Sequence, residues 1–159
     1  EINFLFKLFE NFLIKKINIL TENKIKLKII GNQKLFSSKL RNLIKKSEEK
    51  TKKNSNLQIN LALNYGSKDE IVRALILLKK KKKLINIKNI EENLYTKKMP
   101  NPDILIRTGN TKRLSNFLLW QLAYTEIFFE KKLWPDFNDK DYNKIIRKFK
   151  RVKRNFGKI

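Results

Sequence analysis

Two hydrophobic periods alternate along this chain, and the alternation restricts its fold more than any other property of the sequence. Apolar residues recur at three- and four-residue steps over residues 1–22, which predicts a helix with one apolar face. Residues 25–29 then alternate between apolar side chains and lysines, and this strand pattern stops at Gly31. A helix followed by a strand begins the alternating order that is typical of an α/β fold.

The same alternation continues to the end of the chain. Further strands are expected over residues 57–63 and 103–107. Further helices are expected over residues 37–53, with Ser37 or Ser38 as the cap, and over residues 69–78, 87–94 and 139–152, with a stiff aromatic corner at 134–137. We therefore predict a single α/β domain over residues 1–159, with a central, mostly parallel β-sheet and helices on both faces.

The composition excludes several kinds of site. The chain has 159 residues, of which 41% are hydrophobic, so it is long enough to bury a core. It contains no Cys and no His, so disulfides, thiolate metal sites and imidazole bases are excluded. Its apolar runs are too short and too interrupted by Lys to span a bilayer, and its start lacks the apolar core of a signal peptide. We expect a cytoplasmic protein.

The formal net charge of +23 would ordinarily suggest a nucleic-acid partner. Lys, Asn and Ile are abundant throughout the chain, however, which indicates a bias of the genome toward A and T more than a focused basic face. The densest cluster, Lys79–Lys83, fits a solvated helix end. We therefore expect no nucleic acid among the partners.

Most side chains that could support chemistry lie in one stretch, Pro102–Phe129. Its strand ends in Arg107, and a polar turn containing Gly109 leads to Arg113 and Ser115. Two guanidiniums, hydroxyls and free backbone N–H groups at the carboxyl end of a strand suit a phosphate or diphosphate. The alternative is that both arginines are solvated loop residues.

A second polar turn follows the strand over residues 57–63. Asn64 opens this turn, which contains Gly66 and precedes a helix. Open parallel sheets bind their ligands at such positions, although an ordinary connection between strand and helix has the same pattern.

Glu126 stands between two apolar segments, residues 117–124 and 127–129. The first segment predicts a buried helix or an interface. If Glu126 is buried, its carboxylate needs a partner, because an isolated ion there is costly. Mg²⁺ in an oxygen-only site shared with a diphosphate and a salt bridge to Lys or Arg are both compatible with the pattern.

Several motifs occur in a fixed order and together resemble one family. They are IIGN, TKKNSNLQINLALNYGSKDEI, DILIRTGNTKRLSNFLLWQLAYTEIFF, WPDF and RNFG. This series is similar to the carboxy-terminal portion of the bacterial undecaprenyl diphosphate synthases, which are cis-prenyltransferases. The resemblance spans essentially the whole chain, including the first helix.

The resemblance implies a transferase that condenses isopentenyl diphosphate with an allylic diphosphate such as farnesyl diphosphate and requires Mg²⁺. The implied product is an undecaprenyl lipid carrier for cell-wall sugars. The family acts as a homodimer, so the resemblance implies a homodimer in the cytoplasm, either free or at the inner face of the membrane, with at most peripheral contact through the lipid product.

The same resemblance implies roles for particular residues. Arg107, Arg113 and Ser115 match positions that hold the phosphates of isopentenyl diphosphate. Glu126 matches the Mg²⁺ ligand, and Asn64 lies near the substrates in the family. Trp134 and residues 117–124 are implied in packing and the subunit interface, and the closing RNFG resembles a tail that reaches a neighbouring subunit.

The chain also departs from the family pattern. The family's Asp-Gly-Asn-x-Arg-Trp motif, which supplies the catalytic aspartate and lies on the first strand, has no match here. We therefore expect that residues 1–159 contain no catalytic residue and lack the first strand of the family fold. We also expect the isolated chain to be inactive. Asn110-Thr111 replaces a common Gly-Glu, and Ser67-Lys68 replaces Gly-Arg. The alternative function is that of a non-catalytic or degenerate member acting as a partner subunit.

Overall fold

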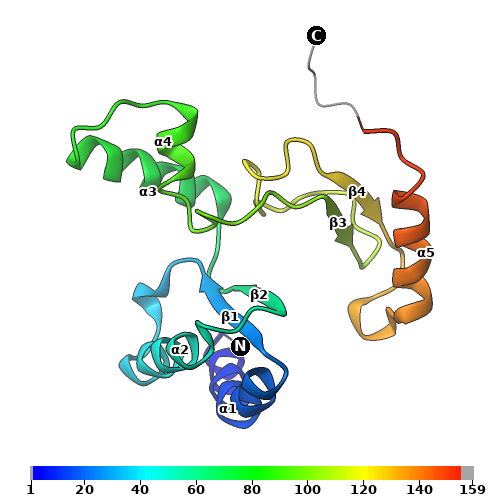
Figure 1. Cartoon of the computed structure of the whole chain (residues 1–159), viewed down its shortest axis with the longest axis horizontal. Helices are drawn as coiled ribbons and strands as arrows, with labels where there is room; N and C mark the ends of the chain where they lie inside the picture. The colour runs from blue at the N-terminus through cyan, green and yellow to red at the C-terminus, as the bar shows by residue number, and fades with distance from the viewer. Residues whose placement is uncertain (1, 155–159) are drawn as a thin grey trace. The chain divides into compact units, whose positions relative to one another are not determined.

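The computed structural model describes residues 2–154, with side chains from residue 4 onward, and the chain divides into two compact units, Glu1–Thr96 and Lys97–Ile159. The first unit contains α1 (Ile2–Glu22), β1 (Ile25–Ile30), η1 (Gln33–Leu35), α2 (Ser38–Thr51), β2 (Leu57–Ala62), α3 (Ser67–Lys80) and α4 (Ile87–Glu91). The second contains β3 (Ile104–Arg107), β4 (Glu126–Phe129), η2 (Trp134–Asp136) and α5 (Asp139–Phe149) (Figure 1).

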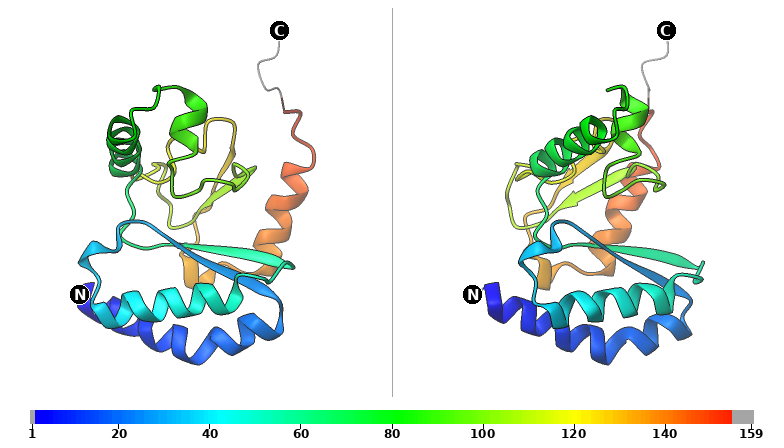
Figure 2. Two further views of the ribbon diagram at one scale, coloured as in Figure 1. Left: turned by 60° about the vertical axis from the view of Figure 1, so that its left-hand side comes forward. Right: turned by 90° about the vertical axis from the view of Figure 1, so that its left-hand side faces the viewer.

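In the first unit, β1 and β2 form a parallel pair, with Ile25 opposite Leu57 and Ile30 opposite Ala62. Helices α1 and α2 lie together along one face of this pair (Figures 1 and 2). The core between them consists of Leu13, Leu20, Leu27, Ile29, Phe36, Leu40 and Ile44. The apolar stripe predicted for residues 1–22 therefore packs on the strand that follows it.

The predicted start of the second helix is confirmed. The side chain of Ser37 accepts a hydrogen bond of 3.0 Å from the N–H of Leu40, which caps α2. Farther inside the unit, the hydroxyl of Thr51 accepts from the N–H of Leu27 at 3.1 Å and attaches the end of α2 to β1. Both termini of α2 are therefore fixed by side-chain hydroxyls.

The second unit has its own parallel pair, in which Ile104 lies opposite Glu126 and Arg107 opposite Phe129. Helix α5 begins with a capping box. The side chain of Asn138 accepts from the N–H of Asp141, and the carboxylate of Asp141 accepts from the N–H of Asn138.

The helix offered as one alternative for residues 117–124 is not formed, because this segment is a series of turns. Ser115, Asn116 and Leu118 have φ angles of +49°, +61° and +46°, in the left-handed region. Residues in this region cannot continue a right-handed helix. Within the segment, Gln121 and Leu122 are the buried residues.

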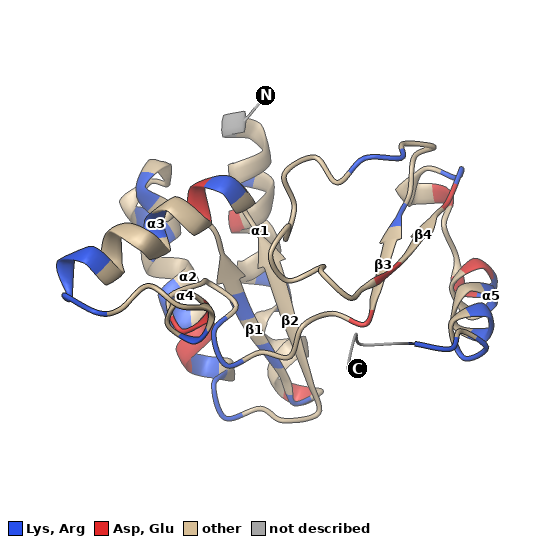
Figure 3. Ribbon diagram, turned by 90° about the horizontal axis from the view of Figure 1, so that it is seen from above, with Lys and Arg blue, Asp and Glu red and all other residues tan. Residues whose placement is uncertain are grey.

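The predicted α/β class is confirmed, because parallel strands pair in both units and helices flank them. The strands are hydrogen-bonded as two pairs, β1–β2 and β3–β4. The prediction of a single domain stays a prediction. Lys and Arg residues, coloured blue on the ribbon of Figure 3, occur on α2, α3, α5 and the loops. No helix within residues 2–154 combines the length and hydropathy needed to cross a bilayer.

Candidate functional site

The loop after β3, residues 108–116 and here called the anion loop, is tied to the segment after β4. The N–H of Gly109 donates to the carbonyl of Lys132 at 2.7 Å, and the N–H of Asn110 donates to the carbonyl of Glu130 at 3.1 Å. The segment 130–133 is called the brace segment below. The expectation of free backbone N–H groups is therefore wrong for Gly109 and Asn110, because these donors bind protein carbonyls.

Arg107 ends β3 and lies next to the brace segment. Its carbonyl accepts from the N–H of Glu130 at 2.8 Å, so its backbone is fixed. Its Nε is buried and has no hydrogen-bond partner in the described structure, and none of the ion pairs found within residues 2–154 includes it. The Nε of Arg73 in the first unit is buried in the same way, and what distinguishes Arg107 is its place at the carboxyl end of β3, beside the anion loop, where a guanidinium can pair with an anionic ligand.

Arg113 and Ser115 are exposed members of the anion loop. Ser115 has a left-handed backbone, which non-glycine residues adopt infrequently. Farther back in the loop, the hydroxyl of Thr111 donates to the carbonyl of Gly109 at 3.2 Å. Arg107, Arg113 and Ser115 thus all belong to the end of β3 and the loop that leaves it, as the sequence predicts.

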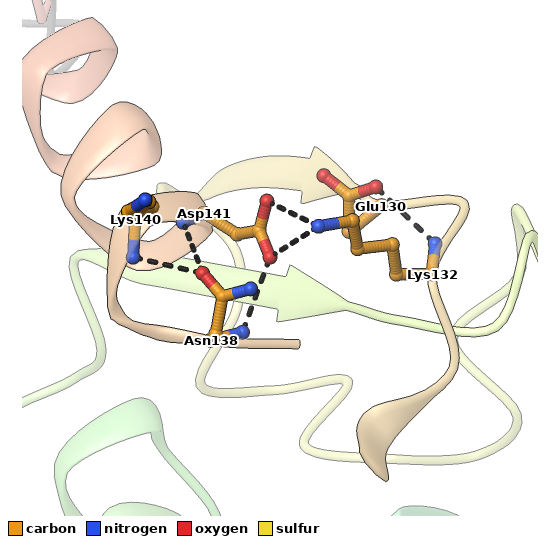
Figure 4. Close-up of polar contacts among 5 residues, drawn as sticks. All are labelled: Glu130, Lys132, Asn138, Lys140 and Asp141. Carbon is orange, nitrogen blue, oxygen red and sulfur yellow. Dashed lines mark hydrogen bonds and ion pairs between the residues drawn. The ribbon is translucent and has the colours of Figure 1, made fainter. Parts of the chain in front are cut away.

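An ion pair holds the brace segment against α5 (Figure 4). The Nζ of Lys132 donates to both carboxylate oxygens of Asp141, at 2.9 and 2.8 Å. This hydrogen bond and charge raise the pKa of Lys132 above its ordinary value. The pKa of Asp141 is lowered, first by Lys132 and then by the N–H of Asn138.

Glu126 occupies the opposite end of the strand pair from Arg107. It is the first residue of β4, whereas Arg107 is the last of β3, and the register separates them by three residue steps, about 10 Å along the strands. Glu126 is half-buried, and no ion pair to Lys or Arg is found for it among the described residues. The salt-bridge alternative is therefore not observed.

The donor set around Glu126 limits how a metal could bind. No group of three or more Asp or Glu residues that could enclose a cation occurs in the described part of the chain. Mg²⁺ characteristically keeps several waters and binds one or two carboxylates together with substrate phosphates. A single half-buried carboxylate fits that mode of binding, with a diphosphate supplying the further oxygens.

Arg154 also lies at the amino end of β3. Its guanidinium forms an ion pair with Asp103 and donates to the carbonyl of Tyr124 at 3.2 Å. The other residues of the RNFG segment, 155–157, lie outside the described residues, so the role of this segment in a neighbouring subunit stays a prediction.

Asn64 belongs to the first unit, where it joins the turns that follow β1 and β2. Its side-chain amide donates to the carbonyl of Asn32 at 2.8 Å, and its carbonyl accepts from the N–H of Asn32 at 3.0 Å. Gly31 permits this close approach, because a Cβ there would lie 2.1 Å from the carbonyl oxygen of Leu63. The amide N–H of Asn64 thus has a structural role, and its role toward substrates stays a prediction.

A cavity of about 690 Å³ adjoins Asn64 in the first unit. Glu70 lies in its wall and is 1% exposed, and its carboxylate accepts from the hydroxyl of Tyr65 and the N–H of Tyr95. The guanidinium of Arg73, which is also on α3, lies 4.0 Å from the ring centre of Tyr95. Sequence reasoning missed this cluster, although an acidic residue on the apolar face of a helix was a visible signal.

Comparison with known proteins matches residues 1–157 to the family described as "Putative undecaprenyl diphosphate synthase". The chain belongs to this undecaprenyl diphosphate synthase family. An isoprenyl transferase of Rickettsia typhi is 42% identical over 159 residues, which are 99% of this chain and 70% of that protein. The ditrans,polycis-undecaprenyl-diphosphate synthase ((2E,6E)-farnesyl-diphosphate specific) of Pasteurella multocida is 42% identical over 164 residues, 99% of this chain and 68% of its own.

A crystal structure supports the same assignment. A probable undecaprenyl diphosphate synthase from Campylobacter jejuni superposes with a TM-score of 0.90 at 40% identity, over 99% of this chain and 75% of that one. The family predicted from the ordered motifs is therefore confirmed, and with it the general class of prenyltransferases.

Proposed function

We propose that this undecaprenyl diphosphate synthase family member is a cis-prenyltransferase that condenses isopentenyl diphosphate with an allylic diphosphate, such as farnesyl diphosphate. The observation that carries the proposal is Arg107. A buried guanidinium nitrogen without a hydrogen-bond partner, at the carboxyl end of a parallel strand, is suited to a diphosphate. The Pasteurella multocida relative, named as specific for farnesyl diphosphate, supports the choice of allylic substrate.

In this proposal Arg107, Arg113 and Ser115 bind the diphosphate of the incoming isopentenyl unit. Arg107 has a fixed backbone and serves as the anchor, whereas the exposed Arg113 and Ser115 close on the diphosphate from the loop. In the condensation a carbon–carbon bond forms, the bond between the allylic carbon and pyrophosphate breaks, and a proton leaves. The named residues orient the nucleophilic double bond and do not take part in covalent chemistry.

We further propose that Glu126 holds Mg²⁺ together with diphosphate oxygens and water. The metal would supply charge neutralisation for the diphosphates. The half-buried carboxylate of Glu126, with no cationic partner found in the described residues, is available for this role.

Four wider features belong to the proposal and rest on the family. The product would be a long-chain undecaprenyl lipid carrier for cell-wall sugars. Asn64 would lie near the bound substrates. The protein would act as a homodimer. It would work in the cytoplasm, with peripheral contact to the inner face of the membrane through its lipid product.

The proposal is tested by following label from isopentenyl diphosphate into lipid products. The protein, expressed from its intact gene, is incubated with farnesyl diphosphate, labelled isopentenyl diphosphate and Mg²⁺, and the products are extracted and sized. We expect polyprenyl products with the unaltered protein and a large loss with Arg107→Met. Lys112→Met removes an exposed cation of the same loop and is the matched control.

The alternative function gives a different result in the same experiment. A non-catalytic partner subunit would bind diphosphates and yield no extractable label. That outcome would reject the enzymatic proposal while leaving the anion site intact.

A further inference from the structure

We propose that Lys132 and Asp141 are positioning residues for the anion loop, so that an ion pair outside the loop sets how tightly the loop binds a diphosphate. This inference rests on the proposed function, because it takes Arg107 and the anion loop as the diphosphate site.

The anion loop is held by hydrogen bonds to the brace segment. Two N–H groups of the loop, those of Gly109 and Asn110, donate to carbonyls of the brace segment at 2.7 and 3.1 Å. The brace segment also reaches the anchor residue, since the N–H of Glu130 donates to the carbonyl of Arg107 at 2.8 Å. A displacement of the brace segment therefore moves the loop and the anchor together.

The brace segment is in turn attached to α5. Lys132 binds both carboxylate oxygens of Asp141, and its own N–H donates to the carboxylate of Glu130 at 3.2 Å (Figure 4). The carboxylate of Asp141 is itself fixed by the N–H of Asn138 at 3.1 Å. Contacts thus run without a break from the capping box of α5 to the N–H of Gly109.

The ion pair between Lys132 and Asp141 lies in a partly shielded position near the anion loop. The side chain of Asp141 is 17% exposed and that of Lys132 is 44% exposed, so the pair is partly shielded from solvent. Another ion pair within residues 97–154, between Arg154 and Asp103, lies at the opposite end of β3. Of these two ion pairs, the one between Lys132 and Asp141 therefore lies near the carboxyl end of β3, where the anion loop begins.

Two mechanisms by which the pair could act predict opposite results for one variant. If Lys132 acted only by attracting the ligand, Asp141→Asn would release its charge and strengthen diphosphate binding. If the pair positions the loop, both Lys132→Met and Asp141→Asn weaken binding. Without the pair the loop is less ordered in the free protein, and the free-energy cost of ordering it is subtracted from the binding free energy. Asn at position 141 can still accept from the N–H of Asn138, which preserves the start of α5.

The experiment titrates inorganic pyrophosphate into the purified protein by calorimetry, well below the unfolding temperature. Because pairs of this exposure are weak, we expect an affinity lower by about two- to five-fold in Lys132→Met and Asp141→Asn. Lys132→Arg should restore wild-type binding, and Lys131→Met, which removes a neighbouring exposed lysine, should have no effect. Amide hydrogen exchange at Gly109 should accelerate in the two weakened variants alone.

The outcomes separate this inference from the proposed function. Both proposals are overturned if the unaltered protein binds no pyrophosphate. They are also overturned if the Arg107→Met variant binds pyrophosphate with the same affinity as the unaltered protein. If binding depends on Arg107 while Lys132→Met and Asp141→Asn match the wild type, or Asp141→Asn binds more tightly, the positioning role alone is overturned.

Discussion

Replacing Gly31 by alanine tests the tight junction between the turns that follow β1 and β2. Gly31 has a φ of +118°, and an added Cβ would lie 2.1 Å from the carbonyl oxygen of Leu63. A carbon and an oxygen in contact lie about 3.3 Å or more apart, so the backbone must move by about 1.2 Å. That shift would disrupt two hydrogen bonds, Leu63 N–H to Ile30 at 2.9 Å and Asn32 N–H to Asn64 at 3.0 Å.

The expected cost follows from these contacts. Two backbone hydrogen bonds contribute about 1 kcal/mol each, and the strained φ adds about 1–2 kcal/mol. A total of about 3–4 kcal/mol should lower the unfolding midpoint by about 10 °C. Far-UV circular dichroism during heating measures this change.

Gly109→Ala is the matched control. Its φ is +85°, but the nearest atom to an added Cβ is a methyl carbon of Leu133 at 3.8 Å, an ordinary contact. Gly109→Ala should therefore lower the free energy of unfolding only by the cost of the strained backbone, about 1–2 kcal/mol. If Gly31→Ala lowers the midpoint no more than Gly109→Ala, the close approach described for the first unit is refuted.

Three further predictions concern stability. Leu40→Ala removes a fully buried side chain and should cost about 2–5 kcal/mol in urea unfolding, so a loss below that range would contradict the core assignment. Asn138→Ala removes the cap of α5 and should cost about 1 kcal/mol, whereas Asn138→Ser should retain most of the stability. The pKa of Asp141 is lowered, chiefly by Lys132, so its stabilisation is present above the ordinary carboxyl pKa and is lost as pH falls through the lowered value. The difference in unfolding free energy between wild type and Asp141→Asn should therefore disappear in acid, and a constant difference would contradict the pairing.

Much of the fold could be predicted because local signals agreed with the final structure. The helix predicted over residues 1–22 and the strand predicted from residue 25 to the glycine at 31 correspond to α1 and β1, and Ser37, one of the two predicted caps, caps α2. Element ends were less accurate. Helix α3 extends from Ser67 to Lys80, two residues beyond each end of the predicted range 69–78. Sequence patterns locate the ends of a helix only to within one or two residues.

Two elements near the candidate site could not be assigned from local pattern. The strand β4, Glu126–Phe129, follows another apolar segment, and a continuous apolar run does not distinguish strand from helix. Residues 117–124 form turns because the left-handed backbone at Ser115 and Leu118 interrupts a helix, and neither residue type announces that conformation. In both segments the backbone conformation is determined by tertiary contacts and not by local sequence.

The location of the candidate site residues could be predicted from the sequence, whereas the contacts that support them could not. Arg107, Arg113 and Ser115 lie at the end of a strand and in the loop after it, as expected, and their role toward a diphosphate stays a prediction. The contact between Gly109 and Lys132 depends on the parallel pairing of β3 and β4, which brings residues distant in sequence together. No local signal marks such a contact.

The central claim, that Arg107 anchors a diphosphate, is tested most directly by titrating isopentenyl diphosphate into the wild-type protein and two variants. A hydrogen bond to a charged group contributes about 1.5–3 kcal/mol, so Arg107→Met should weaken binding by about 10-fold to 150-fold. Lys112→Met, which removes an exposed cation of the same loop, should change it by less than about two-fold. Equal binding by Arg107→Met and the wild-type protein would contradict the claim.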